Sequence, residues 1–125
     1  MARILVIDDE ELLRDTFEDA LQSAGHDLAT AENGIIGVER YREGIFDLVI
    51  TDIIMPDKEG LQTIIEIREI EPEQRIIAVS GGGRDLHLGY LESARMFGAV
   101  ETLAKPIFMH HLLARVTACL DECHD

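Results

Sequence analysis

The sequence lacks any hydrophobic run long enough to cross a membrane, for which about 18 apolar residues are needed. Its start, Met-Ala-Arg-Ile-Leu-Val-Ile-Asp-Asp, reaches acidic residues too early for a secretory signal peptide. These two absences predict a cytoplasmic protein that does not enter the membrane. Linkers, internal repeats and low-complexity segments are also absent, so we expect one domain over residues 1–121 and a short tail, 122–125.

Cysteine is scarce, and both cysteines, Cys119 and Cys123, fall within the last seven residues. A bond between them would close only a trivial loop, so we expect no disulfide framework. Together with His124 they could hold a soft metal ion on a helix face, but a frayed acidic terminus is the simpler interpretation. The neighbouring His110 and His111 are expected on the surface of the last helix.

Basic residues are few, because eleven lysines and arginines stand against twenty-five acidic residues and give a net charge of -14. Such a balance opposes direct contact with nucleic acid or an anionic membrane, and it suits a cation or a basic partner protein. An acidic surface also serves solubility alone. The charge therefore excludes partners more clearly than it assigns a function.

What the sequence does contain is a regular alternation of short apolar runs and helical patterns. The runs that predict buried strands are 3–7, 26–31, 46–51, 75–79 and 99–104, and the stretches that predict helices are 10–24, 34–42, 61–70, 85–97 and 108–120. Strict alternation with short connections is typical of a parallel sheet covered on both faces. We therefore predict an α/β, flavodoxin-like three-layer sandwich: a five-stranded parallel sheet of order 2-1-3-4-5 with five helices, its second strand near an edge.

Polar side chains follow the predicted strands at the points where those strands end. Asp8 and Asp9 come after the first, Asp52 after the third, Ser80 after the fourth and Lys105 after the fifth. Because the carboxyl ends of parallel strands meet at one edge, all five are expected in one cleft. Three carboxylates there repel one another, and Mg²⁺ would relieve the repulsion. A metal-bound aspartate is also a nucleophile toward phosphoryl groups, so the sequence predicts phosphoryl transfer onto Asp52.

The same residues belong to an ordered set of motifs that resembles the receiver domain of two-component response regulators over essentially the whole chain. The matching segments are Ile4-Leu-Val-Ile-Asp8-Asp9-Glu10, Asp47-Leu-Val-Ile-Thr-Asp52-Ile-Ile-Met-Pro56 with Gly60, then Ser80, and finally Lys105-Pro106. Each motif alone is modest evidence, but the four in this order are specific.

The resemblance implies that Asp52 accepts a phosphoryl group from a phosphohistidine of a sensor histidine kinase or a phosphotransfer protein. Ser80 and Lys105 would bind phosphoryl oxygens, and the Lys105–Pro106 bond is expected to be cis. The phosphoaspartate would later hydrolyse. The expected protein is thus a signalling switch rather than a turnover enzyme, a monomer or weak dimer without its own output domain, and it acts on a downstream partner protein.

For the metal, the resemblance implies that Mg²⁺ is held by Asp9, Asp52 and the backbone carbonyl of Ile54. Asp8 would act through water. Asp57 is expected to cap the following helix rather than to bind the ion.

Two features depart from the family pattern. Thr102 stands three residues before Lys105, where the family usually has Tyr or Phe, so the usual aromatic switch is absent. The segment after Ser80 is also longer than usual and begins with a run of glycines, residues 81–83. We therefore place the expected conformational switch in residues 80–92, with Tyr90 as a substitute aromatic.

Two other functions stay open. A non-cycling interaction module with the same fold is favoured by Thr102 and opposed by the complete acidic set. An aspartyl-phosphate phosphatase would typically carry a second acid two residues after the nucleophile, where this chain has Ile54.

Overall fold

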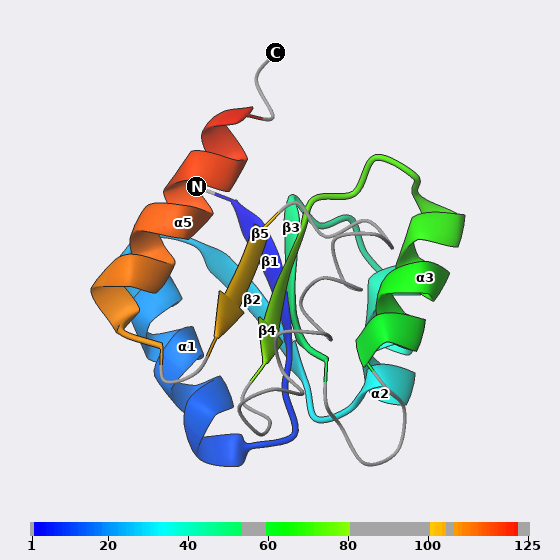
Figure 1. Ribbon diagram of the computed structural model, residues 1–125, viewed down its shortest axis with the longest axis horizontal. Helices are drawn as coiled ribbons and strands as arrows, with labels where there is room; N and C mark the ends of the chain where they lie inside the picture. The colour runs from blue at the N-terminus through cyan, green and yellow to red at the C-terminus, as the bar shows by residue number, and fades with distance from the viewer. Residues whose placement is uncertain (1, 54–59, 81–100, 105–106, 123–125) are drawn as a thin grey trace.

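A parallel sheet with helices on both faces forms the molecule (Figure 1). The computed structural model describes residues 2–53, 60–80, 101–104 and 107–122. The strands are β1 (Arg3–Ile7), β2 (Asp27–Ala31), β3 (Leu48–Asp52), β4 (Ile76–Ser80) and β5 (Glu101–Ala104). The described helices are α1 (Glu11–Ser23), α2 (Gly34–Arg42), α3 (Gly60–Ile70) and α5 (Met109–Glu122). The helix predicted over 85–97 lies outside the described residues.

The strand order is β2-β1-β3-β4-β5 and every neighbouring pair is parallel, which confirms the predicted topology and the edge position of β2. In the register, Ile7 lies beside Thr51, Asp52 beside Val79, and Ser80 beside Ala104. The carboxyl ends of β1, β3 and β4 therefore meet at one edge of the sheet, which we call the carboxyl edge. The opposite end, where the strands begin, is the amino edge.

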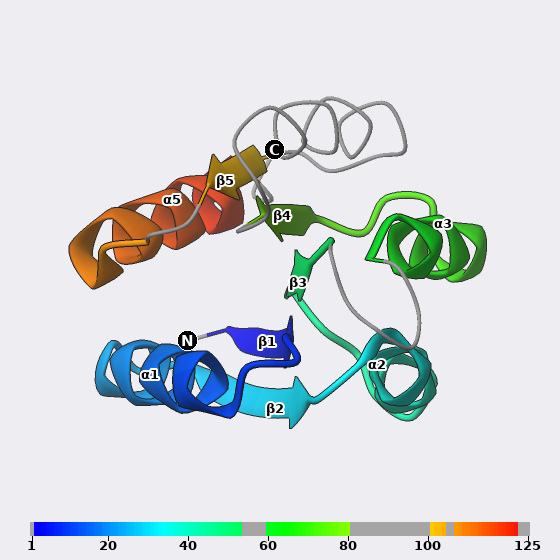
Figure 2. The ribbon, with the colours of Figure 1, turned by 60° about the horizontal axis from the view of Figure 1, so that its bottom comes forward.

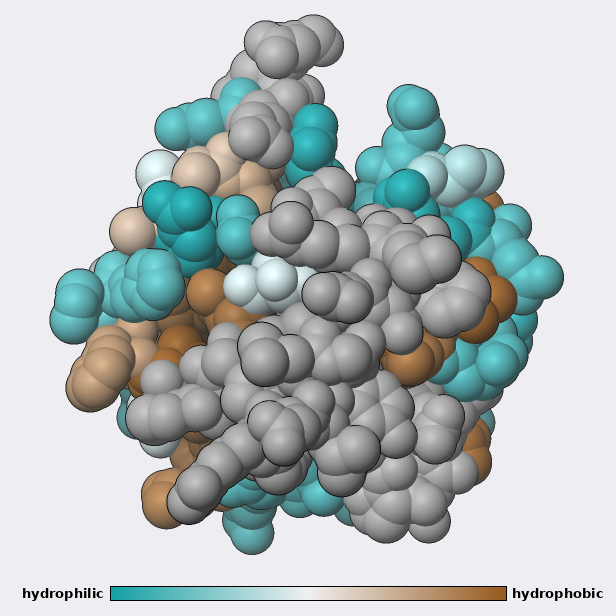
Figure 3. All heavy atoms as spheres, in the orientation of Figure 1, coloured by the Kyte–Doolittle hydropathy of each residue, from teal (hydrophilic) through white to brown (hydrophobic). Residues whose placement is uncertain are grey.

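Two apolar layers hold the sheet between its helices (Figure 2). In β1, Leu5 and Ile7 pack toward α2 and α3, whereas Ile4 and Val6 pack toward α1 and α5. All four are buried, because a strand covered on both faces must be apolar on both. In Figure 3, brown apolar groups lie beside α3 and α5, while teal hydrophilic residues cover much of their outer surfaces.

Local chemistry fixes where the helices begin and end. The side chain of Asn33 accepts a hydrogen bond from the Ile36 backbone N–H at 2.9 Å and so caps α2. Gly25 follows α1 with a φ of 96°, a conformation that glycine adopts without steric cost. Gly37 lets α2 approach β1 closely, because a Cβ at this position would lie 2.5 Å from Cδ1 of Ile7.

The structure shifts some predicted boundaries and corrects one assignment. Asp52 and Ser80 are the last residues of β3 and β4, not the residues after them. Cys119 is only 4% exposed and lies in α5 on the same face as Leu112 and Val116, so the frayed terminus predicted around it is wrong at this residue. Its spacing of three residues from Val116 and seven from Leu112 puts it on the helix face that packs against the sheet. Cys123 and His124 lie outside the described residues, while His110 and His111 are exposed as predicted.

In the part of the chain that the structure describes, each helix is too short or too polar to be a membrane span.

Candidate functional site

Asp52 is the buried carboxylate at the end of the central strand. It is 4% exposed, and it ends β3 between β1 and β4. The backbone around it is held on both sides: the Ile53 N–H donates to the Val79 carbonyl at 3.0 Å, and the Thr51 hydroxyl donates to the Asp52 carbonyl at 3.0 Å. The hydrogen bonds of the sheet and the bond from the Thr51 hydroxyl fix the backbone that carries the Asp52 carboxylate.

Asp8 lies directly after β1 and is 1% exposed. Its N–H donates to the Ala31 carbonyl at 3.1 Å, and its own carbonyl accepts from Nη1 of Arg14 at 2.8 Å. Its Oδ1 accepts the Glu10 N–H at 2.9 Å, a local turn of the kind that aspartate side chains stabilise. This turn bends the chain back over the edge before α1 begins.

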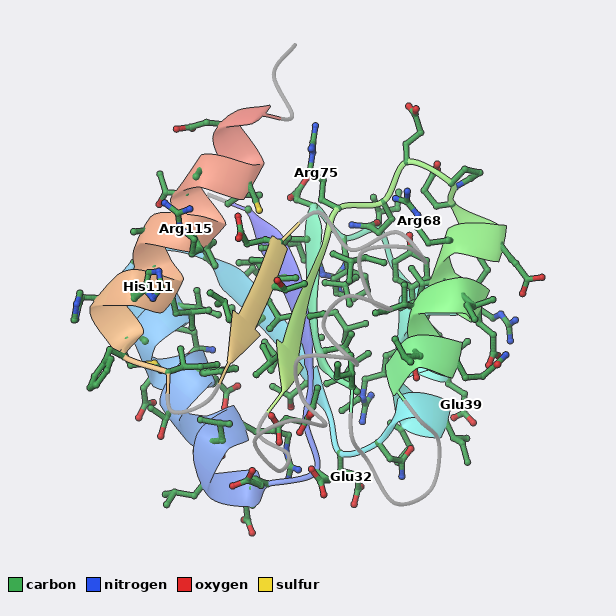
Figure 4. All side chains as sticks on the ribbon, viewed as in Figure 1. Glu32, Glu39, Arg68, Arg75, His111 and Arg115 are labelled. Carbon is green, nitrogen blue, oxygen red and sulfur yellow. The ribbon has the colours of Figure 1, made fainter. Side chains whose placement is uncertain are left out.

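The turn brings a third carboxylate to the site. One ligand oxygen from each of Asp8, Glu10 and Asp52 lies within 4.8 Å of the other two. Asp8 and Asp52 are buried, whereas Glu10 is exposed at the rim. Glu32, which follows β2, lies at the same end of the molecule (Figure 4), so this edge is strongly acidic.

The acidic trio, Asp8, Glu10 and Asp52, has the donor chemistry of a Mg²⁺ site. Hard cations prefer carboxylate oxygens, and the three ligand oxygens of the trio lie within 4.8 Å of one another. Charges this close repel in a partly buried site, and a divalent cation would turn the repulsion into attraction. The residues therefore fit the ion.

The helices add a weaker positive contribution at the same edge. Each of α1, α2 and α3 follows a strand that ends there, and their amino termini start at Glu11, Gly34 and Gly60. The amino end of a helix carries a partial positive charge from its unpaired N–H groups. Anionic groups, including carboxylates and phosphoryl oxygens, are stabilised near such ends.

The predicted site residues fall into three groups. Asp8 and Asp52 lie in the trio, while Asp9 is exposed beside it. Ser80 ends β4, one position beyond the Val79 that pairs with Asp52. Ile54, Asp57, Lys105, Pro106 and the predicted switch segment beyond Ser80, which includes residues 81–83 and Tyr90, lie outside the described residues.

Glu10 is the residue that the motif did not assign to the site. Its sequence position, directly after the acidic pair and before the first helical residue, favours a helix start, and the structure does make it the N-cap position of α1 without a side-chain cap bond. The signal in the sequence for its place in the site was Asp8, because an aspartate side chain commonly accepts a hydrogen bond from the N–H two residues later.

Comparison with known proteins agrees with this geometry. Residues 4–117 match the family model described as response regulator receiver domain. The chain is 34% identical over 120 residues to the chemotaxis protein CheY of Bacillus subtilis, covering 95% of this chain and 98% of that protein. It is 35% identical over 121 residues to the DNA-binding transcriptional regulator NtrC of Azospirillum brasilense, covering 97% of this chain but 24% of that longer relative.

Solved structures show the same similarity. A response regulator receiver domain protein from Clostridium thermocellum superposes with a TM-score of 0.90 at 31% identity, over 98% of this chain and 96% of the other. A CheY-like receiver domain protein from Methanospirillum hungatei gives a TM-score of 0.91 at 26% identity, over 98% and 95% of the two chains.

Proposed function

This chain belongs to the response regulator receiver domain family, and we propose that it accepts a phosphoryl group on Asp52 from a phosphohistidine of a sensor histidine kinase or phosphotransfer protein. The observation that carries the proposal is the position of Asp52: it is 4% exposed, at the carboxyl edge, within 4.8 Å of two further carboxylates. A lone surface aspartate has no such surroundings, and a structural carboxylate is not usually placed beside others of its own charge.

In the proposed reaction an oxygen of the Asp52 carboxylate bonds to phosphorus, and the bond from phosphorus to the donor's imidazole nitrogen breaks, so that the electron pair stays on the imidazole. Bound Mg²⁺ would supply charge neutralisation for the phosphoryl oxygens. Asp9, Asp52 and the backbone carbonyl of Ile54 would hold the ion, with Asp8 acting through water. Ser80 and Lys105 would bind phosphoryl oxygens, and hydrolysis would later regenerate the carboxylate.

The rigid frame around Asp52 supports this chemistry because phosphoryl transfer depends mainly on positioning and charge. The buried carboxylate ends a central strand, so its orientation does not rely on a loop. Signalling through a downstream partner protein is part of the proposal. Its cytoplasmic location remains a prediction.

The test is phosphoryl incorporation from a small phosphodonor such as acetyl phosphate, with Mg²⁺, followed by intact mass measurement. We expect the wild type to gain one phosphoryl mass and Asp52→Asn to gain none. Asp47→Asn is the matched control, because Asp47 lies before β3 at the amino edge, where its Oδ2 accepts the Arg3 N–H at 2.8 Å. An unmodified wild type, or equal incorporation in Asp52→Asn, would rule out the proposed acceptor.

A second function, a non-cycling interaction module, is favoured by Thr102. This residue lies in β5 beside Ala78 and is half-buried, where the family usually has a large aromatic ring. A module of this kind would not incorporate the phosphoryl group at all. The incorporation experiment therefore separates the two functions directly.

A further inference from the structure

The amino edge carries a groove that the phosphoryl chemistry does not use. It lies between the ends of α2 and α3, has a volume of about 330 Å³, and is defined here by Tyr41, Arg42, Ile45, Phe46, Ile70 and Glu71. We call it the α2–α3 groove. Because Phe46 precedes β3 and Asp52 ends it, the groove and the phosphoryl acceptor lie at opposite ends of the same strand.

The floor of the groove is preformed. The Tyr41 hydroxyl donates to Oε1 of Gln74 at 2.7 Å, and the rings of Tyr41 and Phe46 stack with centroids 6.0 Å apart. The guanidinium of Arg3 lies over the Phe46 ring, 4.9 Å from its centroid. Arg68 holds the loop after α3, since its Nη1 donates to the Gln74 carbonyl at 2.7 Å. A surface fixed in this way loses little conformational entropy when something binds to it.

The rim of the groove exposes apolar side chains. Ile45 is 87% exposed and Ile70 is 43% exposed, and Ile45 is the most exposed of the large hydrophobic residues in the described part of the chain. Single exposed hydrophobic residues are ordinary, but two beside an aromatic floor form a larger apolar surface. Burying it would remove that surface from water.

The opposite charges on the rim of the groove favour a second copy of this chain as the partner. Arg42 stands at the end of α2 and Glu71 directly after α3, so a cation and an anion flank the same apolar surface. The Glu73 N–H donates to Oε1 of Glu71 at 3.2 Å and orients that carboxylate. In a twofold contact each patch meets its own copy, so the Arg42 of one chain would face the Glu71 of the other, twice.

We propose that the α2–α3 groove is a pairing surface between two copies of this chain, in which Ile45 of each copy packs into the groove of the other and two Arg42–Glu71 pairs close the rim. The net charge of -14 on each chain opposes this association. At an ionic strength of about 0.15 M the Debye length is about 8 Å, so distant charges are screened while contacts on the rim persist. The result is a weak dimer that leaves both Asp52 sites accessible.

Sedimentation equilibrium between about 10 μM and about 1 mM protein, at about 0.15 M salt, tests the proposal. The wild type is expected to shift from monomer toward dimer over this range. Ile45→Asp is expected to stay monomeric, whereas Leu12→Asp, which changes a side chain that is 80% exposed at the other end of the molecule, should dimerise like the wild type.

Charge reversal provides the sharper measurement. Arg42→Glu alone and Glu71→Arg alone should each weaken pairing by about tenfold or more, because both rim contacts then join like charges. An equimolar mixture of the two variants should pair again, since both contacts in the mixed dimer join opposite charges. Thermal unfolding of each variant verifies that it is folded.

A wild type that remains monomeric up to the highest concentration overturns the proposal and leaves the groove to another partner or to none. Equal dimerisation of Ile45→Asp and wild type, or no pairing in the mixture, would overturn it as well.

Discussion

The polar groups at the two ends of the sheet are arranged in opposite ways. At the carboxyl edge, the acidic trio gathers three like charges, two of them on buried residues. At the amino edge, Tyr41, Gln74 and Arg68 are neutral or basic groups joined by hydrogen bonds of 2.7 Å. One end concentrates charge that an external ion can neutralise. The other end satisfies its polar groups from within the chain.

This difference assigns binding to the carboxyl edge and stabilisation of the fold to the amino edge. Buried like charges destabilise the folded state, so a cluster of this kind is maintained for what it binds. A buried neutral pair such as Tyr41 and Gln74 stabilises the fold, because each group replaces a hydrogen bond to water with one inside the protein. The hydrogen bonds of the amino edge therefore contribute to stability, whereas the carboxylates of the carboxyl edge are placed for binding.

The largest expected effect is on the carboxyl edge, where Mg²⁺ should stabilise the wild type. At a concentration about 100 times the dissociation constant the gain is about 2.7 kcal/mol. Asp52→Asn should lose most of this gain, because one of the three carboxylates that would attract the ion is gone. Thermal unfolding with and without Mg²⁺ measures both changes. Equal Mg²⁺ responses in the two proteins would contradict the assignment.

The same measurement distinguishes Asp9 from Glu10 as a contributor to the site. The proposed ligand set includes Asp9, whereas the trio in the structure includes Glu10. We expect Asp9→Asn to reduce the Mg²⁺ response more than Glu10→Gln. The reverse order would assign the ion to the acidic trio and exclude Asp9 from direct ligation.

A smaller effect is expected at the amino edge from Tyr41→Phe. The change removes the hydroxyl that donates to Gln74, and a buried acceptor left unsatisfied costs about 1–2 kcal/mol of unfolding free energy. Urea unfolding measures the loss. Phosphoryl incorporation and the Mg²⁺ response should both stay at wild-type levels, and a change in either would show that the two ends of the sheet are coupled.

Tyr41 also gives this prediction a pH dependence. Burial, followed by the charge of Glu71, raises the pKa of Tyr41 above its usual value of 10.0, while Arg68 lowers it to a smaller extent. The stability that this group contributes is therefore complete below the unfolded pKa and is lost as pH rises through the folded pKa. The difference in unfolding free energy between wild type and Tyr41→Phe should shrink above about pH 10. A constant difference would contradict the raised pKa.

The sequence predicted the fold and two members of the trio for a simple physical reason. Strands buried on both faces give continuous apolar runs, and the carboxyl ends of parallel strands meet at one edge. The convergence of Asp8 and Asp52 follows from that topology alone, without any knowledge of side-chain contacts. It is confirmed because both lie at strand ends that the sheet register fixes.

The remaining features depend on side-chain pairing that no periodic pattern encodes. Tyr41 and Gln74 are 33 residues apart and meet only after α2 and the loop after α3 have packed. Glu10 enters the trio through a turn in which its N–H donates to the Asp8 side chain. The burial of Cys119 depended on where α5 ends, and helix ends are the least certain part of a pattern.

The smallest expected effect on stability comes from His26. This histidine adds a group that titrates near neutral pH to the amino edge. Its Nδ1 accepts the Ala2 N–H at 3.2 Å, so the folded state favours the neutral imidazole. Burial, and then the positive charge of the amino terminus, lower its pKa below 6.5. Below that value the unfolded chain binds more protons than the folded one. The free energy of unfolding therefore decreases as pH is lowered, until the folded pKa is reached. His26→Gln should therefore flatten the dependence of the urea midpoint on pH between about pH 5 and about pH 7. Parallel curves for His26→Gln and wild type would show that this histidine does not link protonation to folding.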